Sequence, residues 1–200
     1  RTERMTDTPR RLVVGISGAS GVIYGIRLLE ALRQDAAIET HLVITPAGRI
    51  TIAQETDYSV GQVEALADVV HKPENIGASI ASGSFATLGM AIVPCSIKSL
   101  SAVAHSYADD LLVRAADVTL KEGRPLVLVV RETPLHLGHL RLMAQAAELG
   151  AVILPPMPAF YSRPQTLDDI INETVGRVLL RLGIDNELYF EWLGLRGGRG

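Results

Sequence analysis

The sequence has little of several features that would assign it to other classes of protein. It contains one cysteine, Cys95, among 200 residues, so no internal disulfide can form, and this suits a reducing compartment such as the cytoplasm. No apolar run approaches the ~20 residues that a membrane-spanning helix requires. The net charge is −3 and basic residues form no run, which gives no support for nucleic-acid binding. We therefore expect a cytoplasmic protein with no membrane span and no nucleic-acid partner.

Two common nucleotide-binding signatures are also missing. The segment Gly15–Gly21 reads Gly-Ile-Ser-Gly-Ala-Ser-Gly, without the spacing of a dinucleotide fingerprint and without the Gly-Lys-Ser/Thr of a P-loop. The apolar run Thr40–Ile44 ends in Thr45 and Pro46, where an NAD-binding unit carries an acidic residue for the ribose. The pattern favours a mononucleotide such as FMN, although a simple tight turn would use the same glycines.

What the sequence does contain begins with a strand, a glycine-rich turn and a helix. Arg11–Ile16 is apolar and predicts a buried strand, and the apolar spacing of Val22–Gln34 predicts an amphipathic helix. The turn between them gathers free backbone N–H groups and the positive end of the helix, and Ser17 and Ser20 add hydroxyl groups. We therefore expect the phosphate of FMN on this first turn.

The same alternation continues along the chain. The apolar runs are 12–16, 41–44, 90–93, 126–130 and 151–154, and the helical patterns are 22–34, 50–54 with 60–70, 98–122 (as two helices), 135–149 and 167–182. Continuous apolar strands between helices predict an α/β fold, a three-layer doubly wound parallel sheet of Rossmann-like or flavodoxin-like type. We expect one flavoprotein domain over 11–184, a disordered lead-in over 1–10, and a tail over 185–200 that packs partly on a neighbouring subunit.

Ligands of such sheets collect at the carboxyl ends of the strands. Ser96 follows the third predicted strand, where it serves equally well as a helix cap or as a ligand contact. Arg131 and Glu132 follow the fourth strand, where the charges form an ion pair or face a ligand. Glu55 ends a predicted helix, a position that disfavours acidic groups and so hints weakly at function. Cys95 fits a small buried hydrophobe better than a nucleophile.

Further candidates lie outside these strand ends. His136 and His139 are three residues apart, but no third ligand completes a metal site, so we expect no metal. Tyr161 lies in a loop between prolines that is too stiff and too aromatic for a generic linker. Trp192, the single tryptophan, belongs to an aromatic tail that we expect to pack on a neighbour or to cover a site.

Together these segments resemble the flavin prenyltransferases of the UbiX type over about residues 11–192. The matching segments are 15–21, Glu55-Thr56-Asp57, 94–101, Arg114-Ala115-Ala116-Asp117, Lys121-Glu122, Arg131-Glu132-Thr133-Pro134 and 158–161. The resemblance implies transfer of a dimethylallyl group from dimethylallyl monophosphate to FMN, without a metal. FMN is then the acceptor substrate and leaves as prenylated FMN, which serves a UbiD-type decarboxylase, typically in ubiquinone biosynthesis.

The resemblance also assigns residues to roles. It places FMN on Ser17, Gly18, Ala19, Ser20, Thr45 (where the family often has Ser), Ser96, Ile97, Lys98, Ser99 and Arg131. It places the donor among Arg114, Lys121, Arg131, Glu132, Tyr161, Arg177 and Trp192, and the catalytic set is Ser20, Glu55, Lys121 and Glu132. The chain lacks a longer insert near residues 70–80 in which some relatives carry a further Trp.

The implied chemistry agrees with these residue types. Arg and Lys side chains stabilise a leaving phosphate as the allylic C–O bond breaks, and an apolar pocket protects the allylic cation from water. Carbon–carbon bond formation then releases a proton, which Glu132, Ser20 or the released phosphate accepts. The family forms homododecamers with sites between subunits, so we expect Tyr161, Arg177 or Trp192 to meet a flavin held by another chain.

Two other functions remain open at this point. One is an FMN-dependent Cys decarboxylase of related fold, which would show a catalytic His in an early helix and a substrate loop rich in Asn and Met. The loop Pro155–Tyr161 is instead rich in proline. The other is a flavin carrier without catalytic activity that delivers FMN to a partner.

Overall fold

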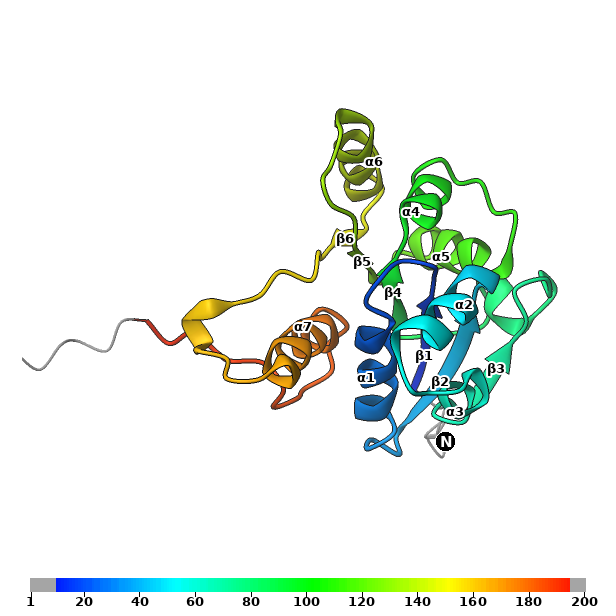
Figure 1. Ribbon diagram of the computed structural model, residues 1–200. Helices are drawn as coiled ribbons and strands as arrows, with labels where there is room; N and C mark the ends of the chain where they lie inside the picture. The colour runs from blue at the N-terminus through cyan, green and yellow to red at the C-terminus, as the bar shows by residue number, and fades with distance from the viewer. Residues whose placement is uncertain (1–9, 195–200) are drawn as a thin grey trace, which may run out of the picture.

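A six-stranded, wholly parallel sheet forms the centre of the computed structural model, which describes residues 10–194 (Figure 1). The strands are β1 (Arg10–Ile16), β2 (Ile38–Ile44), β3 (Val69–His71), β4 (Gly89–Cys95), β5 (Leu126–Val130) and β6 (Val152–Ile153). The helices are α1 (Val22–Leu32), α2 (Pro46–Glu55), α3 (Val60–Glu64), α4 (Ile97–Ala104), α5 (Leu111–Lys121), α6 (Leu137–Glu148) and α7 (Leu167–Arg181), with short 3-10 turns η1 (Ser79–Ala81) and η2 (Phe160–Ser162). The strand order is β3-β2-β1-β4-β5-β6, the doubly wound order, which confirms the predicted fold class.

The topology places one crevice at the centre of the sheet. β1 pairs with β2 on one side and with β4 on the other, so the direction of the strand order reverses between β1 and β4. Ligands of doubly wound sheets bind outside the carboxyl ends of the strands at such a reversal. The segments that follow β1, β2 and β4 therefore have the position of a ligand site.

The main difference from the predicted elements lies between 60 and 71. The helical pattern over 60–70 is wrong beyond α3, because 69–71 forms the edge strand β3 and pairs with β2. Asp68 accounts for the change: its carboxylate accepts from the Thr40 amide at 2.7 Å and from the Thr40 hydroxyl at 2.9 Å. These bonds hold the segment beside β2, and this long-range pairing overrides the local helical pattern.

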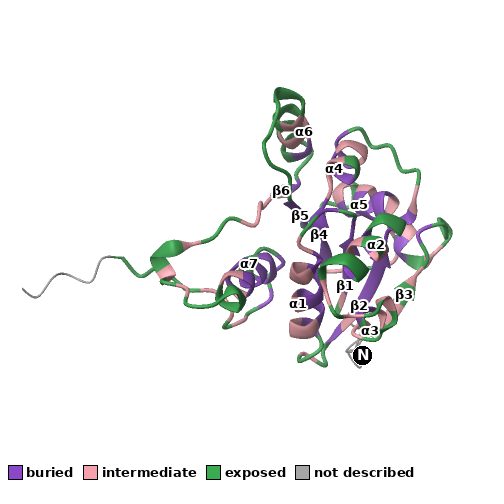
Figure 2. Cartoon of the chain, viewed as in Figure 1, coloured by how far each residue is buried: buried purple, intermediate pink, exposed green. Residues whose placement is uncertain are grey.

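Hydrophobic side chains fill both faces of the sheet, as the buried strands in Figure 2 indicate. One cluster packs beneath α1 and α7 and includes Ile26 and Val178, both fully buried. The other packs beneath α4 and α5 and includes Leu100 and Leu112, also fully buried. This three-layer packing explains why the central strands read as continuous apolar runs.

Two parts of the chain reach beyond this core. α6 keeps Leu137 and Leu140 exposed, and Figure 2 draws most of this helix as exposed or intermediate. The segment between β6 and α7 forms an arm that extends away from the sheet and carries η2 at its far end (Figure 1). Phe160 on this arm is 74% exposed, so a large aromatic surface is left unpacked within the single chain.

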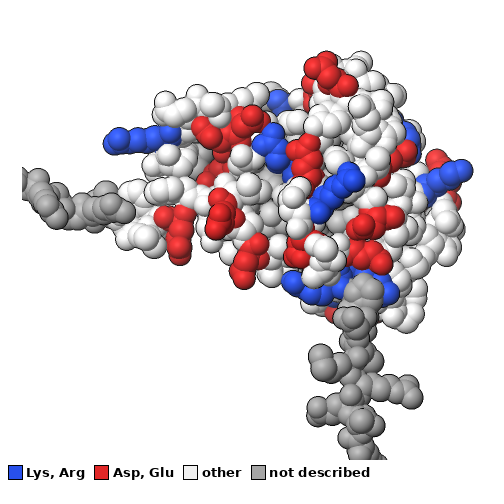
Figure 3. Space-filling model, turned by 90° about the horizontal axis from the view of Figure 1, so that it is seen from below, with Lys and Arg blue, Asp and Glu red and all other residues white. Residues whose placement is uncertain are grey.

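The charged side chains show no field of one sign on the face seen in Figure 3, where acidic and basic groups are interspersed. Among residues 10–194, no helix is long and apolar enough to cross a membrane. Residues 1–9 and 195–200, which include most of the expected lead-in and the end of the expected tail, lie outside the described residues.

Candidate active site

Three helix N-termini meet at the carboxyl ends of β1, β2 and β4. α1 begins after Gly21, α2 after Thr45 and α4 after Ser96. The Thr45 hydroxyl accepts from the Gly48 amide at 3.0 Å, and the Ser96 hydroxyl accepts from the Ser99 amide at 3.2 Å. Each N-terminus presents amide donors and partial positive charge, so their convergence forms an anion-binding region.

A cavity of about 310 Å³ opens between α2 and α4. Its lining is Gly18, Thr45, Pro46, Ala47, Ser96, Lys98, Ser99, Ala102, Asp109, Asp110 and Val113. Five of the residues predicted to hold FMN are therefore brought together. Asp109 and Asp110 are additions that the sequence reasoning missed, although an Asp pair directly before a helical pattern marks a helix N-cap.

Ser17, one of the predicted flavin residues, has its hydroxyl engaged within the protein. The hydroxyl donates to the Pro94 carbonyl at 2.8 Å and accepts from the Ser96 amide at 2.8 Å, and the side chain is buried. Ser17 therefore ties the end of β1 to the end of β4. The neighbouring Ser20 is exposed at the same turn.

Gly18 allows this turn to lie against α2. A Cβ atom at Gly18 would lie 2.3 Å from the Ala47 Cβ, which is closer than real side chains approach. The glycine is therefore required by the packing of the turn on α2, which brings the first and second strand ends to one cavity.

Glu55 is connected to the first turn of α1 rather than to its own helix. Its Oε2 accepts from the Gly21 amide at 2.8 Å and from the Val22 amide at 3.4 Å. The carboxylate thus supplies the cap that the Gly21 side chain cannot, and it places a negative charge at the α1 N-terminus.

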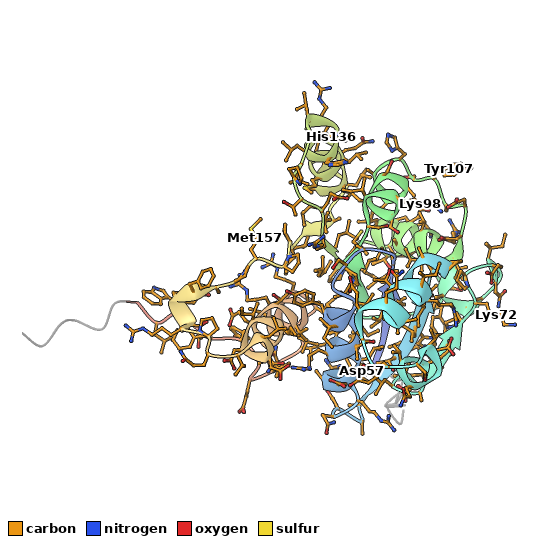
Figure 4. All side chains as sticks on the ribbon, viewed as in Figure 1. Asp57, Lys72, Lys98, Tyr107, His136 and Met157 are labelled. Carbon is orange, nitrogen blue, oxygen red and sulfur yellow. The ribbon has the colours of Figure 1, made fainter. Side chains whose placement is uncertain are left out.

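Some first-turn amides of α2 and α4 are free to bind an anion. Within residues 10–194, the first-turn amides of Ala47, Ile97 and Lys98 donate to no acceptor. The N-termini of α2 and α4 therefore offer a phosphate more donors than α1, with the Lys98 side chain exposed beside them. Figure 4 places Lys98 and Tyr107 together at the same end of the molecule, near α4.

A second cavity, of about 370 Å³, lies between α7 and the arm. Its lining is Leu154, Pro155, Met157, Pro158, Ala159, Phe160, Tyr161, Glu173, Thr174 and Arg177. Met157, labelled in Figure 4, lies on the segment that leads from β6 into the arm. Two predicted donor residues, Tyr161 and Arg177, thus share one cavity, and Arg177 has no ion-pair partner among the described residues.

Trp192 lies beside this cavity through an aromatic cluster. Its ring meets the Tyr161 ring edge-on with centroids 5.7 Å apart, and the Phe190 ring lies 6.0 Å from Tyr161. The tail therefore contacts the arm within one chain.

Tyr24 on α1 lies near residues of β5 and α7, and the sequence reasoning did not identify it. Burial raises the pKa of Tyr24 above its ordinary value, while the nearby charge of Arg131 and a hydrogen bond with Thr174 oppose that shift. Arg131, at the end of β5, and Thr174, in the lining of the second cavity, therefore both lie next to Tyr24. Because Tyr24 belongs to the first turn of α1, the predicted donor residues border the predicted flavin turn.

Glu132 is exposed just beyond β5, and its Oε1 accepts from the Thr133 amide at 3.2 Å. Cys95 is fully buried at the end of β4, as predicted for a small hydrophobe. Burial raises the pKa of the Cys95 thiol to about 12, so the thiol stays protonated near pH 7. Glu132 is therefore accessible at this strand end, whereas Cys95 is enclosed in the core.

Arg114 and Lys121 are not brought to either cavity. α5 starts at Asp110 beside the first cavity, and Lys121 is its last residue, about 15 Å further along the helix at 1.5 Å per residue. Arg114 donates to the Ala81 carbonyl at 3.2 Å and to Asp117 at 3.1 Å, and Lys121 pairs with Glu122. Within one chain, neither Arg114 nor Lys121 lines the cavity that holds Tyr161 and Arg177.

His136 caps α6 and His139 lies in its first turn, with their rings stacked 3.5 Å apart. His136 lies at the outer end of α6, away from the sheet (Figure 4). Within residues 10–194, no three His, Cys, Asp or Glu side chains gather as a metal site would need.

The fold and this site define a class: a doubly wound α/β protein with a mononucleotide site at the strand-order reversal. Comparison with known proteins identifies the family. The model of the Flavoprotein family matches residues 1–179. The chain is 65% identical over 187 residues to the flavin prenyltransferase UbiX of Escherichia coli K12, an alignment that covers 92% of this chain and 99% of that protein. The chain belongs to the flavin prenyltransferase family of the UbiX type.

Solved structures agree with this assignment. The crystal structure of AnUbiX (PadA1) in complex with FMN and dimethylallyl pyrophosphate superimposes with a TM-score of 0.91 at 46% identity, covering 94% of this chain and all of that one. A dodecameric FMN-dependent UbiX-like decarboxylase from Escherichia coli O157:H7 gives 0.90 at 48% identity, covering 92% of this chain and all of that one.

Proposed function

We propose that this protein is a flavin prenyltransferase that moves a dimethylallyl group from dimethylallyl monophosphate to FMN and releases prenylated FMN. The observation that carries the proposal is the presence of two cavities in one chain, one at the N-termini of α2 and α4 and one at Tyr161 and Arg177. The first suits a flavin mononucleotide and the second suits the phosphate of a small donor.

The flavin phosphate belongs at the N-termini of α2 and α4. Their free amides and the Lys98 ammonium attract an anion, whereas the Glu55 carboxylate at the start of α1 repels one. This placement differs from the expectation from the sequence, which put the FMN phosphate on the glycine-rich turn between β1 and α1. It directs the flavin ring toward Ser20 and Glu55, which fits their assignment to the reacting edge.

The donor phosphate belongs beside Arg177 and Tyr161, with Arg131 near Tyr24. Cationic groups there stabilise the phosphate as the allylic C–O bond breaks, and apolar arm residues such as Met157 exclude water from the cation. A carbon–carbon bond to the flavin then forms and a proton leaves, with Glu132, Ser20 or the released phosphate as its acceptor.

The absence of Lys121 and Arg114 from the cavity that holds Arg177 supports a site completed by a second subunit. Lys121 and Arg114 of one chain would meet the donor held by another chain, and the exposed arm and α6 would lie in subunit contacts. The dodecameric relative fits such an assembly, and we propose a homododecamer. Light scattering tests it, because a fully active monomer near 21.5 kDa would exclude shared sites.

The wider roles follow from family membership. We propose that a UbiD-type decarboxylase receives the product, that the pathway is ubiquinone biosynthesis, and that both proteins act in the cytoplasm. We also propose that residues 11–184 form one flavoprotein domain and that the tail from 185 packs partly on a neighbour.

A coupled assay tests this function. The protein is incubated under anaerobic conditions with FMN, a reductant and dimethylallyl monophosphate, and a protein-free filtrate is added to a UbiD-type decarboxylase purified without cofactor. The proposal predicts that the filtrate activates the decarboxylase only when both substrates were present. A flavin carrier would give no activation beyond FMN alone, and a Cys decarboxylase would instead release carbon dioxide from a peptide with a C-terminal cysteine.

A further inference from the structure

Glu173 on α7 is a buried acid that satisfies only one of its two carboxylate oxygens. The side chain is 6% exposed, and its Oε2 accepts from the backbone amide of Phe190 at 2.7 Å. Its Oε1 is buried and has no hydrogen-bond partner among the described residues. The predicted set of site residues does not include Glu173, although it lines the cavity that also holds Tyr161 and Arg177.

A buried carboxylate of this kind does not favour the stability of the folded protein. Burying a carboxylate with an unpaired oxygen costs free energy, and a neutral side chain of similar shape avoids most of that cost. A polar group kept where it opposes stability points to a role in function. The one hydrogen bond that the Glu173 side chain accepts indicates this role, because the donor is the Phe190 amide of the tail.

The tail crosses α7 at close range on either side of that bond. A Cβ atom at Gly176 would lie 2.6 Å from the Tyr189 amide nitrogen, so the glycine leaves room for the tail backbone. The Asn186 amide group donates to the Gly176 carbonyl at 3.1 Å, and its carbonyl accepts from the Leu188 amide at 3.0 Å. Glu173 supplies the last hydrogen bond to α7 before the aromatic end of the tail.

Beyond that bond, the tail reaches the donor cavity. The Phe190 and Trp192 rings both contact Tyr161, which shares its cavity with Arg177. Tyr161 itself is 45% exposed, and its ring pairs with the rings of both tail aromatics. Holding Phe190 in place therefore also holds Tyr161 beside Arg177.

We propose that Glu173 is a positioning residue: its carboxylate anchors the tail at Phe190, and the anchored tail holds Tyr161 and Trp192 over the site of the donor phosphate. This inference rests on the proposed function for the identity of the donor. The hydrogen bond between Glu173 and the tail does not depend on which donor binds. The anchoring role and the proposed function can therefore be tested separately.

The first test uses the intrinsic fluorescence of Trp192, the single tryptophan in the sequence. Glu173→Ala removes the acceptor, so we expect red-shifted emission and faster acrylamide quenching as the tail detaches. Glu173→Gln keeps an oxygen acceptor for the Phe190 amide, so its spectrum should match that of the wild type. Glu187→Ala is the matched control, because Glu187 is an exposed acid in the same tail for which no hydrogen bond is found among residues 10–194.

The second test separates anchoring from folding through the Phe190 amide. Phe190→Pro deletes the N–H donor, whereas Phe190→Ala deletes the ring and keeps the donor. We expect the proline variant to lose docking of Trp192, as Glu173→Ala does, and the alanine variant to keep more of it. This pair remains informative if Glu173→Ala does not fold.

The third test is kinetic. A hydrogen bond to a charged acceptor is strong enough to shift the docking equilibrium about tenfold. We expect Glu173→Ala to raise the KM for dimethylallyl monophosphate by about that factor, with FMN affinity unchanged within about twofold, and Glu173→Gln to restore the wild-type KM.

The inference is overturned if Glu173→Ala and Phe190→Pro leave the emission and quenching of Trp192 unchanged, or if Glu173→Gln behaves like Glu173→Ala in both readouts. A wild-type protein that makes no prenylated flavin would contradict the proposed function instead. In that case the fluorescence results would still decide whether Glu173 anchors the tail.

Discussion

The Glu55 carboxylate accepts a hydrogen bond from the Gly21 amide at 2.8 Å, so the last residue of α2 caps the first turn of α1. Its position at a helix C-terminus, unfavourable for an acid, is explained by this contact across 34 residues of sequence. Because this contact puts a carboxylate at the N-terminus of α1, we propose α2 and α4 rather than α1 as the phosphate site.

Glu55→Ala is therefore expected to destabilise the protein by about 1 kcal/mol, the usual cost of losing an N-cap, or about 2–4 °C in Tm for a chain of this size. Glu55→Gln keeps an acceptor and should lose less than half of that. Thermal unfolding followed by circular dichroism measures both. Equal melting of the wild type and Glu55→Ala would mean that the cap contributes nothing to stability.

Lys98→Ala tests where the flavin phosphate lies. We expect it to weaken FMN binding about tenfold, because one charge-assisted contact to the phosphate is lost. Binding of riboflavin, which has no phosphate, should not change. Lys72→Ala is the control, because Lys72 is an exposed lysine that does not line this cavity, and Figure 4 shows it apart from Lys98. Equal losses for FMN and riboflavin would argue against a phosphate at Lys98.

Arg177→Ala tests the donor site. We expect at least about a tenfold loss in kcat/KM for dimethylallyl monophosphate, because a charged partner of the phosphate is removed, with much less effect on FMN affinity. Arg181→Ala, an exposed arginine one turn further along α7, should behave as the wild type. Parallel losses for donor and flavin would assign Arg177 to structure instead.

Mixed assemblies test whether Lys121 and Arg177 come from different subunits. Lys121→Ala and Arg177→Ala proteins are each expected to be nearly inactive. After unfolding and refolding as an equal mixture, about a quarter of the sites would contain both intact residues if neighbouring chains supply them. Recovery of activity toward that fraction supports a shared site. Absence of any recovery, with the mixed assembly shown by mass, would contradict it.

Much of the fold could be predicted because its signals are local. The strand β5 has the predicted bounds, Leu126–Val130. Gly18, Thr45 and Ser96 line one cavity because parallel strands end at one edge of the sheet. β3 was missed because Val69–His71 is short and continues a helical apolar pattern until Asp68 bonds to β2.

The site was predicted less completely because its decisive contacts join distant residues. The capping of α1 by Glu55 and the position of Tyr24 near Arg131 and Thr174 depend on packing that no local spacing encodes. The tail bond to Glu173 spans 17 residues and leaves no motif. Lys121 could be assigned to the donor by resemblance, but only the folded chain shows that it does not line the cavity of Arg177.

The most direct test of the central claim is mass spectrometry of the flavin extracted after reaction. The assembled protein is incubated under anaerobic conditions with FMN, a reductant and dimethylallyl monophosphate, in buffer containing a metal chelator. The account predicts a new flavin heavier than FMN by one dimethylallyl unit, formed with release of inorganic phosphate and missing when either substrate is omitted. Recovery of unmodified FMN alone, from protein that binds both substrates, would contradict it.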